Sequence, residues 1–376
     1  MDFFTTRMML RMLEQTYPAQ TFFRDTFFKN RVILQEEKVD LDIRKGTRRV
    51  ATYVNRKIGH TIVERQGYTM QTIQPQLIAP MMITTAEDVI KRSAGENIYG
   101  AKNPNERLIE ILARDMRTLD DMIARAEELQ CAQALYTGKI VMPVTDGDGH
   151  VVDVITVDYS DNWNFDKVNW EDVTTSNPSA DFRRWRRTIT KNSGLNADIA
   201  IVGANALEWL YLSLNWREEQ KFIQTNFANY TPKNAPLGAT FVGLHPSLGI
   251  EMFTIDEWVL DAVSGEEVPL ADPNMILIGS TDAYTSLIYG MIYDVAIGSF
   301  AAARVPKSFV RDEPSARFLK LSSAPIAVPH QTDAFLSITV CTKGPTGNDK
   351  KLVREINEAA DEASKDMIDK SKAKTK

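Results

Sequence analysis

The chain has 376 residues, of which 43% are hydrophobic and 25% are charged. That composition is ordinary for a globular protein, and the length favours two domains of about 150 residues each. There are 44 basic and 50 acidic residues, giving a formal charge of −6, which argues against a chain that is generally coated by nucleic acid. The two cysteines, Cys131 and Cys341, exclude a disulfide scaffold and fit a reducing compartment.

Neither the N-terminal residues nor the longest uncharged run predicts targeting to a membrane. Met1 to Leu10 include Asp2 and Arg7 and lack the apolar core of a signal peptide. The uncharged run 66–86 contains several glutamines and prolines, which would not enter a bilayer. We therefore expect no membrane partner.

Histidines, cysteines and glycines do not form a recognised catalytic or metal-binding motif. His60, His150, His245 and His330 are more than 80 residues apart, and no C-x-x-C pair occurs. The sequence also lacks a P-loop, a dinucleotide-binding G-x-G-x-x-G and a nucleophile elbow. We expect a protein that is not an enzyme, with no catalytic residues, no cofactor and no bound metal.

The first 35 residues are rich in aromatic side chains but are too short to form a core of their own. Two phenylalanine pairs, Phe22-Phe23 and Phe27-Phe28, must pack against something larger. Two interpretations remain open. The segment is either an ordinary first helix of this chain's own domain or an arm that reaches a neighbouring subunit.

A basic two-stranded ribbon is predicted next. Residues 38–44 alternate between apolar and charged side chains, as a half-buried strand does, and β-rich runs follow at 49–54 and 61–73. Between Arg44 and Arg65 there are seven basic residues and one acid, Glu64. An isolated hairpin is marginally stable in water, so the ribbon is a solvated hairpin, a nucleic-acid contact or a contact to an acidic neighbour.

Residues 104–138 give the strongest prediction of a helix. Asn103 can cap it, Pro104 suits its first position, and Gly138 can end it. Apolar residues recur every three or four positions on one face. The helix would be about 50 Å long. Its stripe lacks the paired flanking charges of a coiled coil, so we predict a single helix lying across a sheet.

Strands and helices are predicted along the rest of the chain. A hairpin is expected at 139–145 and 151–158, and a helix at 181–191 carries four arginines, which could touch phosphate or form a solvated face. Strand 198–202 runs through Gly203 into a helix, and strands follow at 252–255 and 275–279. A helix is predicted from Asp282 through Leu287 and Ile288, then a last strand at 333–340. The strand ends at Gly203 and Gly279 leave open an alternative, a nucleotide- or phosphate-binding α/β enzyme.

Several blocks, in this order along the chain, resemble the lambda-type major capsid (head) proteins of phages. The resemblance depends above all on Arg304-Val-Pro-Lys-Ser-Phe309, followed by Ser323-Ala-Pro and Asp333-Ala-Phe. Further matching blocks are Thr5-Thr6, the Phe27-Phe28 pair, Glu37-Lys38-Val39 and the run Ala113-Arg-Asp-Met-Arg. Together they cover about residues 1–342, and the lysine-rich tail has no counterpart.

The resemblance implies an α+β chain with the Hong Kong 97-like capsid fold. Its parts would be an N-terminal arm at 1–35, an extended β-hairpin loop at 36–80, a peripheral domain at 81–179 and 299–342 with the spine helix 104–138, an axial α/β domain at 180–298, and a charged C-terminal tail at 343–376. In this fold the extended loop lies across an adjacent subunit, which would explain the basic ribbon.

The resemblance also implies a function and partners. The chain would be a major capsid protein that self-assembles into pentamers and hexamers and closes the icosahedral head of a tailed phage or prophage around double-stranded DNA, enclosing it without specific binding. Other partners would be a separate scaffolding protein, a portal and a decoration protein, and the location would be the virion after assembly in the host cytoplasm. Subunit-interface residues would be Arg44, Lys45, Arg48, Arg49, Arg56, Lys57 and Arg65 in the extended loop, and Phe22, Phe23, Phe27 and Phe28 in the arm.

Overall fold

The computed structural model describes residues 21–36, 38–43, 69–90, 103–146, 150–160, 163–173, 175–213, 215–217, 238–245, 247–260, 265–294, 298–311, 316–347 and 349–351. The chain divides into two units. Unit 1 comprises Met1–Asp161, Asp261–Gly265 and Asp282–Thr332, and unit 2 comprises Asn162–Leu260, Glu266–Thr281 and Asp333–Lys376.

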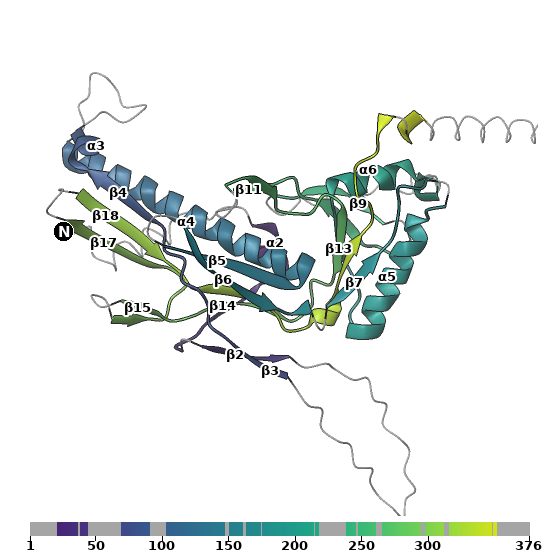
Figure 1. The fold of residues 1–376 in the computed structure, drawn as a ribbon, viewed down its shortest axis with the longest axis horizontal. Coiled ribbons are helices and arrows are strands. Elements are labelled where there is room, and N and C mark those ends of the chain that lie inside the picture. The colour runs from purple at the N-terminus through teal and green to yellow at the C-terminus, as the bar shows by residue number, and fades with distance from the viewer. Residues whose placement is uncertain are drawn as a thin grey trace, which may run out of the picture. The chain divides into compact units, whose positions relative to one another are not determined.

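Unit 1 consists of one long helix with small sheets and hairpins around it (Figure 1). Its helices are α2 (Phe22–Thr26), α3 (Ala86–Ile90) and α4 (Pro104–Thr137). Its strands are β1 (Asn30–Ile33), β2 (Val39–Ile43), β3 (Thr69–Ile73), β4 (Met81–Thr85), β5 (Lys139–Thr145), β6 (Val151–Asp158), β14 (Thr285–Tyr289), β15 (Ile292–Asp294), β16 (Gly298–Phe300), β17 (Val305–Arg311), β18 (Ala316–Ser322) and β19 (Pro325–Pro329). Two three-stranded sheets have the orders β1-β14-β19 and β17-β18-β4.

Helix α4 confirms the strongest sequence prediction. The Asn103 side chain accepts a hydrogen bond from the backbone of Asn105, and Gly138 ends the helix with a left-handed φ of 64°. The apolar stripe of α4, including Leu119 and Ile123, packs against Leu319 of β18. The helix also contacts β5 and β19. In Figure 1 it runs lengthwise beside β5. A single helix on a sheet is therefore the correct interpretation of the stripe.

Strand β14 corrects the predicted helix from Asp282. All five of its residues are buried, and it pairs in parallel with β1 and antiparallel with β19. A strand that is buried on both faces reads as a continuous apolar run, which periodicity alone cannot distinguish from a buried helix. The distant strands β1 and β19 decide the conformation of this segment.

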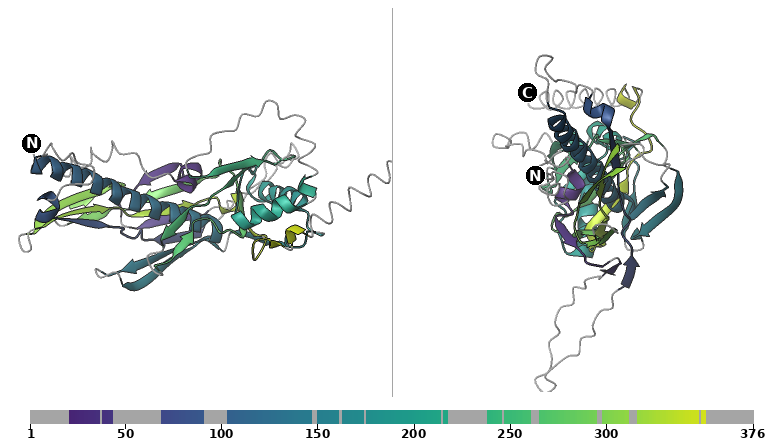
Figure 2. Two further views of the ribbon diagram at one scale, coloured as in Figure 1. Left: turned by 90° about the horizontal axis from the view of Figure 1, so that it is seen from above. Right: turned by 90° about the vertical axis from the view of Figure 1, so that its left-hand side faces the viewer.

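Strands β2 and β3 form a two-stranded stem that projects from the rest of unit 1 (Figures 1 and 2). The pairing runs from Val39 opposite Ile73 to Ile43 opposite Thr69, and Val39 and Ile73 are buried at its base. This antiparallel stem confirms the outer strands of the predicted ribbon. Residues 44–68, between its two free ends, lie outside the described residues.

Unit 2 consists of a six-stranded mixed sheet with two helices (Figure 1). The order is β7-β20-β13-β8-β10-β9, with β7 parallel to β20 and β8 parallel to β10. The strands are β7 (Asn164–Lys167), β8 (Ile199–Val202), β9 (Thr240–Leu244), β10 (Glu251–Thr254), β13 (Met275–Gly279) and β20 (Phe335–Thr339). The helices are α5 (Pro178–Ser193) and α6 (Ala204–Leu212), the short 3₁₀ turn η3 spans Thr332–Ala334, and β11 (Trp258–Leu260) pairs with β12 (Glu267–Pro269).

The division into units differs from the predicted domains at several segments. Residues 261–265 fall in unit 1, although they were predicted to be axial. Residues 162–179 and 333–342 fall in unit 2, although they were predicted to be peripheral, because β20 pairs with β7 and β13. Residues 282–298 fall in unit 1, although they were predicted to be axial, because β14 belongs to the sheet of β1 and β19. Among the described helices, none is long and apolar enough to span a membrane.

Aromatic rings form the core of unit 2 between α5 and the sheet. Phe182, Trp185 and Trp216 are at most 1% exposed and belong to one hydrophobic cluster. His245 is fully buried beside them, and its ring centroid lies 5.1 Å from those of Phe182 and Trp216. Its Nε2 has no hydrogen-bond partner among the described residues. Burial, together with the nearby Arg183 and Arg186, lowers the pKa of His245 to about 4.

Acid should therefore destabilise the protein through His245. In the unfolded chain this histidine takes up a proton near pH 6.5, but in the folded protein only near pH 4, so the folded state loses stability as the pH falls between these values. The loss is about 3 kcal/mol by pH 4. Urea unfolding of the wild-type chain and of His245→Gln at pH 7 and pH 4 should show the difference in unfolding free energy moving in the variant's favour by about that amount. An unchanged difference would contradict the argument.

Candidate assembly site

The predicted interface residues of the extended loop lie outside the described residues. Arg44, Lys45, Arg48, Arg49, Arg56, Lys57 and Arg65 all fall between the paired strands of the stem, in residues 44–68. Only their attachment point, the β2–β3 stem, is described. Their contact with a neighbouring subunit stays a prediction.

The four phenylalanines of the predicted arm are buried within this single chain. Phe22, Phe23, Phe27 and Phe28 are 0–3% exposed. The Phe23 ring lies edge-on to the ring of Tyr136 of α4, with centroids 5.9 Å apart. For the described part of the arm, the packing is that of a first helix docked on its own domain. A contact between these rings and a second subunit stays a prediction, and their apolar surface is already covered.

A carboxylate of the long helix caps the short one. The backbone N–H groups of Phe23 and Arg24, in the first turn of α2, donate to the two carboxylate oxygens of Glu128 at 2.6 and 2.9 Å. Thr21, at the N-cap position, makes no side-chain cap of its own and instead donates to Asp25 at 2.9 Å. A carboxyl group at this end of a helix accepts hydrogen bonds from N–H groups that have no partner within the helix. Glu128 therefore attaches α2 to α4.

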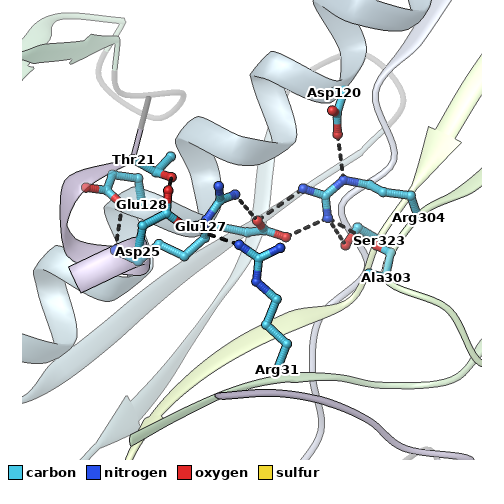
Figure 3. Close-up of polar contacts among 10 residues, drawn as sticks. Thr21, Asp25, Arg31, Asp120, Glu127, Glu128, Ala303, Arg304 and Ser323 are labelled. Carbon is cyan, nitrogen blue, oxygen red and sulfur yellow. Dashed lines mark hydrogen bonds and ion pairs between the residues drawn. The ribbon is translucent and has the colours of Figure 1, made fainter. Parts of the chain in front are cut away.

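Glu127, the neighbouring residue, lies between two arginines from distant parts of the chain (Figure 3). The Glu127 side chain is 0% exposed. Arg24 Nη1 of α2 donates to it at 3.0 Å. Arg304, just before β17, makes a two-point contact at 2.6 and 3.1 Å. Two-point contacts between a guanidinium and a carboxylate are among the stronger polar interactions in proteins.

Arg304 extends the network to further elements. Its Nε donates to Asp120 of α4 at 2.8 Å, and its Nη1 donates to the hydroxyl of Ser323 at 3.2 Å and to the carbonyl of Ala303 at 3.1 Å (Figure 3). The network thus joins α2, α4, the start of β17 and the turn between β18 and β19. Glu127 is 103 residues from Arg24 and 177 residues from Arg304 in sequence, so these contacts are part of the tertiary structure of unit 1.

Burial dominates the electrostatics of this network. It raises the pKa of Glu128 to about 7, although the two backbone N–H groups and Arg24 lower it. Since the free carboxyl ionises near pH 4.5, Glu128 opposes folding increasingly between about pH 4.5 and 7. Burial alone would lower the pKa of Arg304, but hydrogen bonds and the charge of Glu127 raise it. Burial also raises the pKa of Cys131 far above its usual range, so its thiol stays protonated.

Sequence reasoning missed Glu127 and Glu128 although a signal was present. Glu127 follows Ile123 by four positions, so it falls on the apolar stripe of α4. An acid at a buried position requires a cationic or hydrogen-bonding partner. The sequence could not identify Arg24 and Arg304 as those partners, because the ion pairs span more than 100 residues.

Gly203 and Gly279, on which the alternative hypothesis of a nucleotide-binding enzyme depends, are packed closely against other residues of the chain. A Cβ at Gly203 would overlap the backbone of Pro273, and a Cβ at Gly279 would lie 2.5 Å from the ring of Phe335. Close packing of strands and helices thus accounts for both glycines. Among the described residues no group of three or more His, Cys, Asp or Glu side chains could hold a metal ion. A nucleotide-binding enzyme is not supported.

Comparison with known proteins decides the family. The model of the family "Phage major capsid protein E" matches residues 5–340, nearly the whole chain. The chain belongs to this family. It is therefore a structural protein of the phage head and a part of the virion.

Individual relatives agree with this capsid family. The P21 prophage-derived major head protein of Escherichia coli O6:H1 is 25% identical over 353 residues, which cover 90% of this chain and all of that protein. The major capsid protein of Escherichia phage lambda is 23% identical over 349 residues, covering 90% of this chain and 99% of that protein. These matches confirm the lambda-type resemblance that the sequence blocks predicted.

Solved structures show the fold. The crystal structure of a protein described as a prophage capsid protein of E. coli CFT073 superposes with a TM-score of 0.67 at 19% identity, covering 90% of this chain and 99% of that one. A phage-related protein of Bordetella bronchiseptica RB50 gives a TM-score of 0.50 at 13% identity, covering 89% and 96%. The capsid protein has the predicted α+β, Hong Kong 97-like fold.

Replacing the carboxylate at the centre of the network should be costly. Glu127→Gln leaves two buried guanidinium groups facing a neutral amide, so the free energy of unfolding should fall by about 3–5 kcal/mol. Urea unfolding of the unassembled subunit measures this. Arg31→Gln is the matched control, because it removes a pair between half-exposed Arg31 and Asp25 that is worth less than about 1 kcal/mol. Equal effects of the two substitutions would contradict a structural role of the buried network.

Proposed function

We propose that copies of this capsid protein assemble into pentamers and hexamers, which close the icosahedral head of a tailed phage or prophage around double-stranded DNA. The observation that carries the proposal is the family match over residues 5–340, together with the capsid fold of both units. Assembly proceeds through many contacts between identical subunits, each of modest strength.

The two units take the two roles that such a subunit needs. Unit 1, with α4 as its spine, is the peripheral domain, and unit 2, with its six-stranded sheet, is the axial domain around the capsomer axis. The described helix α4 and the mixed sheet support this assignment. The boundaries follow the strand pairing, so the last strand β20 belongs to the axial domain.

The basic ribbon is the contact to the adjacent subunit. Residues 44–68 connect the two strands of the β2–β3 stem in sequence, and seven of those residues are basic. A cluster of like charges is favourable where an acidic partner surface faces it. The rest of the chain is acidic enough to supply such a partner surface, because the whole chain has a net charge of −6 although the ribbon contains seven basic residues.

Further partners follow from the same proposal. A separate scaffolding protein guides assembly, a portal occupies one vertex, and a decoration protein coats the outside of the shell. DNA is enclosed without specific binding, and the net negative charge of the chain supports this, because a repulsive inner surface leaves packaged DNA mobile.

Reversing the charge of two ribbon arginines should block assembly and leave the subunit folded. Arg48→Glu combined with Arg49→Glu removes two attractive contacts and introduces two repulsive ones in every subunit of the shell, while the unfolding of the isolated subunit stays unchanged. Electron microscopy of the purified protein and urea unfolding of the unassembled subunit measure the two effects. Normal shells from the double variant would contradict the role of the ribbon, and a failure of the wild-type chain to form capsomers or shells would contradict the proposed function itself.

A further inference from the structure

Helix α5 presents a basic face away from the sheet of unit 2. The helix has five basic residues and one acidic residue, and its opposite face, with Phe182, Trp185 and Ile189, is buried. Arg183, Arg187 and Lys191 follow one another at four-residue intervals, so they form one row on the exposed side. We call these three residues the basic row.

Two members of the basic row, Arg187 and Lys191, differ from their neighbour Arg184. Arg184 pairs with Asp166 at 2.9 Å and with Asp181 at 3.4 Å within the same unit. Arg187 and Lys191 are exposed, have no such partner among the described residues, and have no acid three or four positions away in the helix. Their charges are therefore available to a second molecule.

A second surface of unit 2 has the complementary character. The described residues of the β11–β12 hairpin and its flanks, 256–260 and 266–267, include four acidic residues and no basic one. Leu260 lies opposite Glu267 in the β11–β12 pair, so Trp258, Leu260 and Glu267 share one face of the hairpin. Trp258 is 60% exposed and Leu260 is 66% exposed. We call this face the acidic hairpin face.

The β11–β12 hairpin leaves large apolar side chains uncovered by the described residues. Two strands of three residues each are marginal in water, and large apolar side chains this exposed on such a hairpin are typical of a surface that a partner covers. The partner that fits this face is a basic surface whose side chains have long aliphatic stems. Such a surface can pair with the carboxylates and pack on the indole ring at the same time.

We infer that the acidic hairpin face of one subunit docks on the basic row of α5 in the next copy of this chain. The inference rests on the proposed capsomer function, and charge complementarity between two surfaces of one sequence identifies the occupant as a second copy. In Figure 1 the sheet of unit 2 lies between α5 and β11, so the two surfaces are on different sides of the unit. A contact between different surfaces of identical subunits repeats head to tail and closes a ring when the rotation allows it.

The contact combines two interactions. Glu267, with the neighbouring acids Asp256 and Glu257, faces the guanidinium of Arg187 and the ammonium of Lys191 in the next subunit. Trp258 and Leu260 pack on the aliphatic stems of the basic row, and the Arg187 guanidinium lies against the indole face. Since each subunit contributes one of each surface, a ring uses every copy of both.

A reciprocal charge exchange in the full-length chain tests the contact. Arg187→Glu combined with Lys191→Glu should raise the subunit concentration required for half-maximal capsomer formation at least about tenfold, equivalent to about 1.4 kcal/mol. Glu267→Arg alone should have a similar effect. Adding Glu267→Arg to Arg187→Glu should recover most of the loss. Analytical ultracentrifugation at several protein concentrations measures assembly, and urea unfolding confirms that each variant is folded.

Controls separate this contact from general charge effects and from the proposed function. Arg117→Glu reverses an exposed charge on α4 of unit 1 and should leave capsomer formation unchanged. Normal capsomers from the single reversals, or no recovery in the reciprocal exchange, overturn the contact while leaving the proposed function intact. If the charge-reversal variants form normal capsomers but no longer bind duplex DNA, the proposed contact is also overturned, because the basic row then binds nucleic acid. Failure of the wild-type chain to form capsomers overturns the proposed function as well.

Discussion

One buried carboxylate, Glu127, connects the elements of unit 1. Glu127 pairs with Arg24 of α2 and with Arg304, which directly precedes β17. Asp120, two turns earlier in α4, also pairs with Arg304. A buried anion is unfavourable unless it is paired, so the position of Glu127 forces both distant segments to meet the long helix. Glu128 adds a direct attachment by capping α2. The aromatic side chains of the first described segment are buried beside these polar contacts, and Phe23 packs on Tyr136 of the same long helix.

The same unit leaves apolar side chains exposed on the other side of a sheet. Strand β18 turns Leu319 toward α4, so its neighbour Phe318 points to the opposite face. There Phe318 lies opposite Phe309 and Ile83 in the strand register, and Phe309 and Ile83 are 41% and 55% exposed. A row of this kind is unusual for a monomer and suits a subunit whose surface is completed by other copies.

Charge is distributed in a way that agrees with such a subunit. Most acidic and basic residues are interspersed, but basic residues concentrate in 44–65 and on α5, and acidic residues concentrate in 256–267. Exposed charge pairs contribute little individually, yet clusters of opposite sign orient two surfaces and reject incorrect partners. Specific contacts between identical chains can therefore coexist with an overall negative charge that disfavours binding to DNA.

Local features were predictable from the sequence alone. The sequence determined α4 with its Asn103 cap and Gly138 end, the stem at 39–43 and 69–73, the hairpin at 139–158, and the strand–Gly203–helix step, because each depends on periodicity or on a residue's own backbone preference. The ordered blocks along the chain also identified the capsid family. Tertiary structure decided that 285–289 is a strand, that β20 joins unit 2, and that Glu127 pairs with Arg24 and Arg304. Those outcomes depend on partners far away in the sequence, and a buried strand or a buried ion pair is defined by its partner and not by its neighbours along the chain.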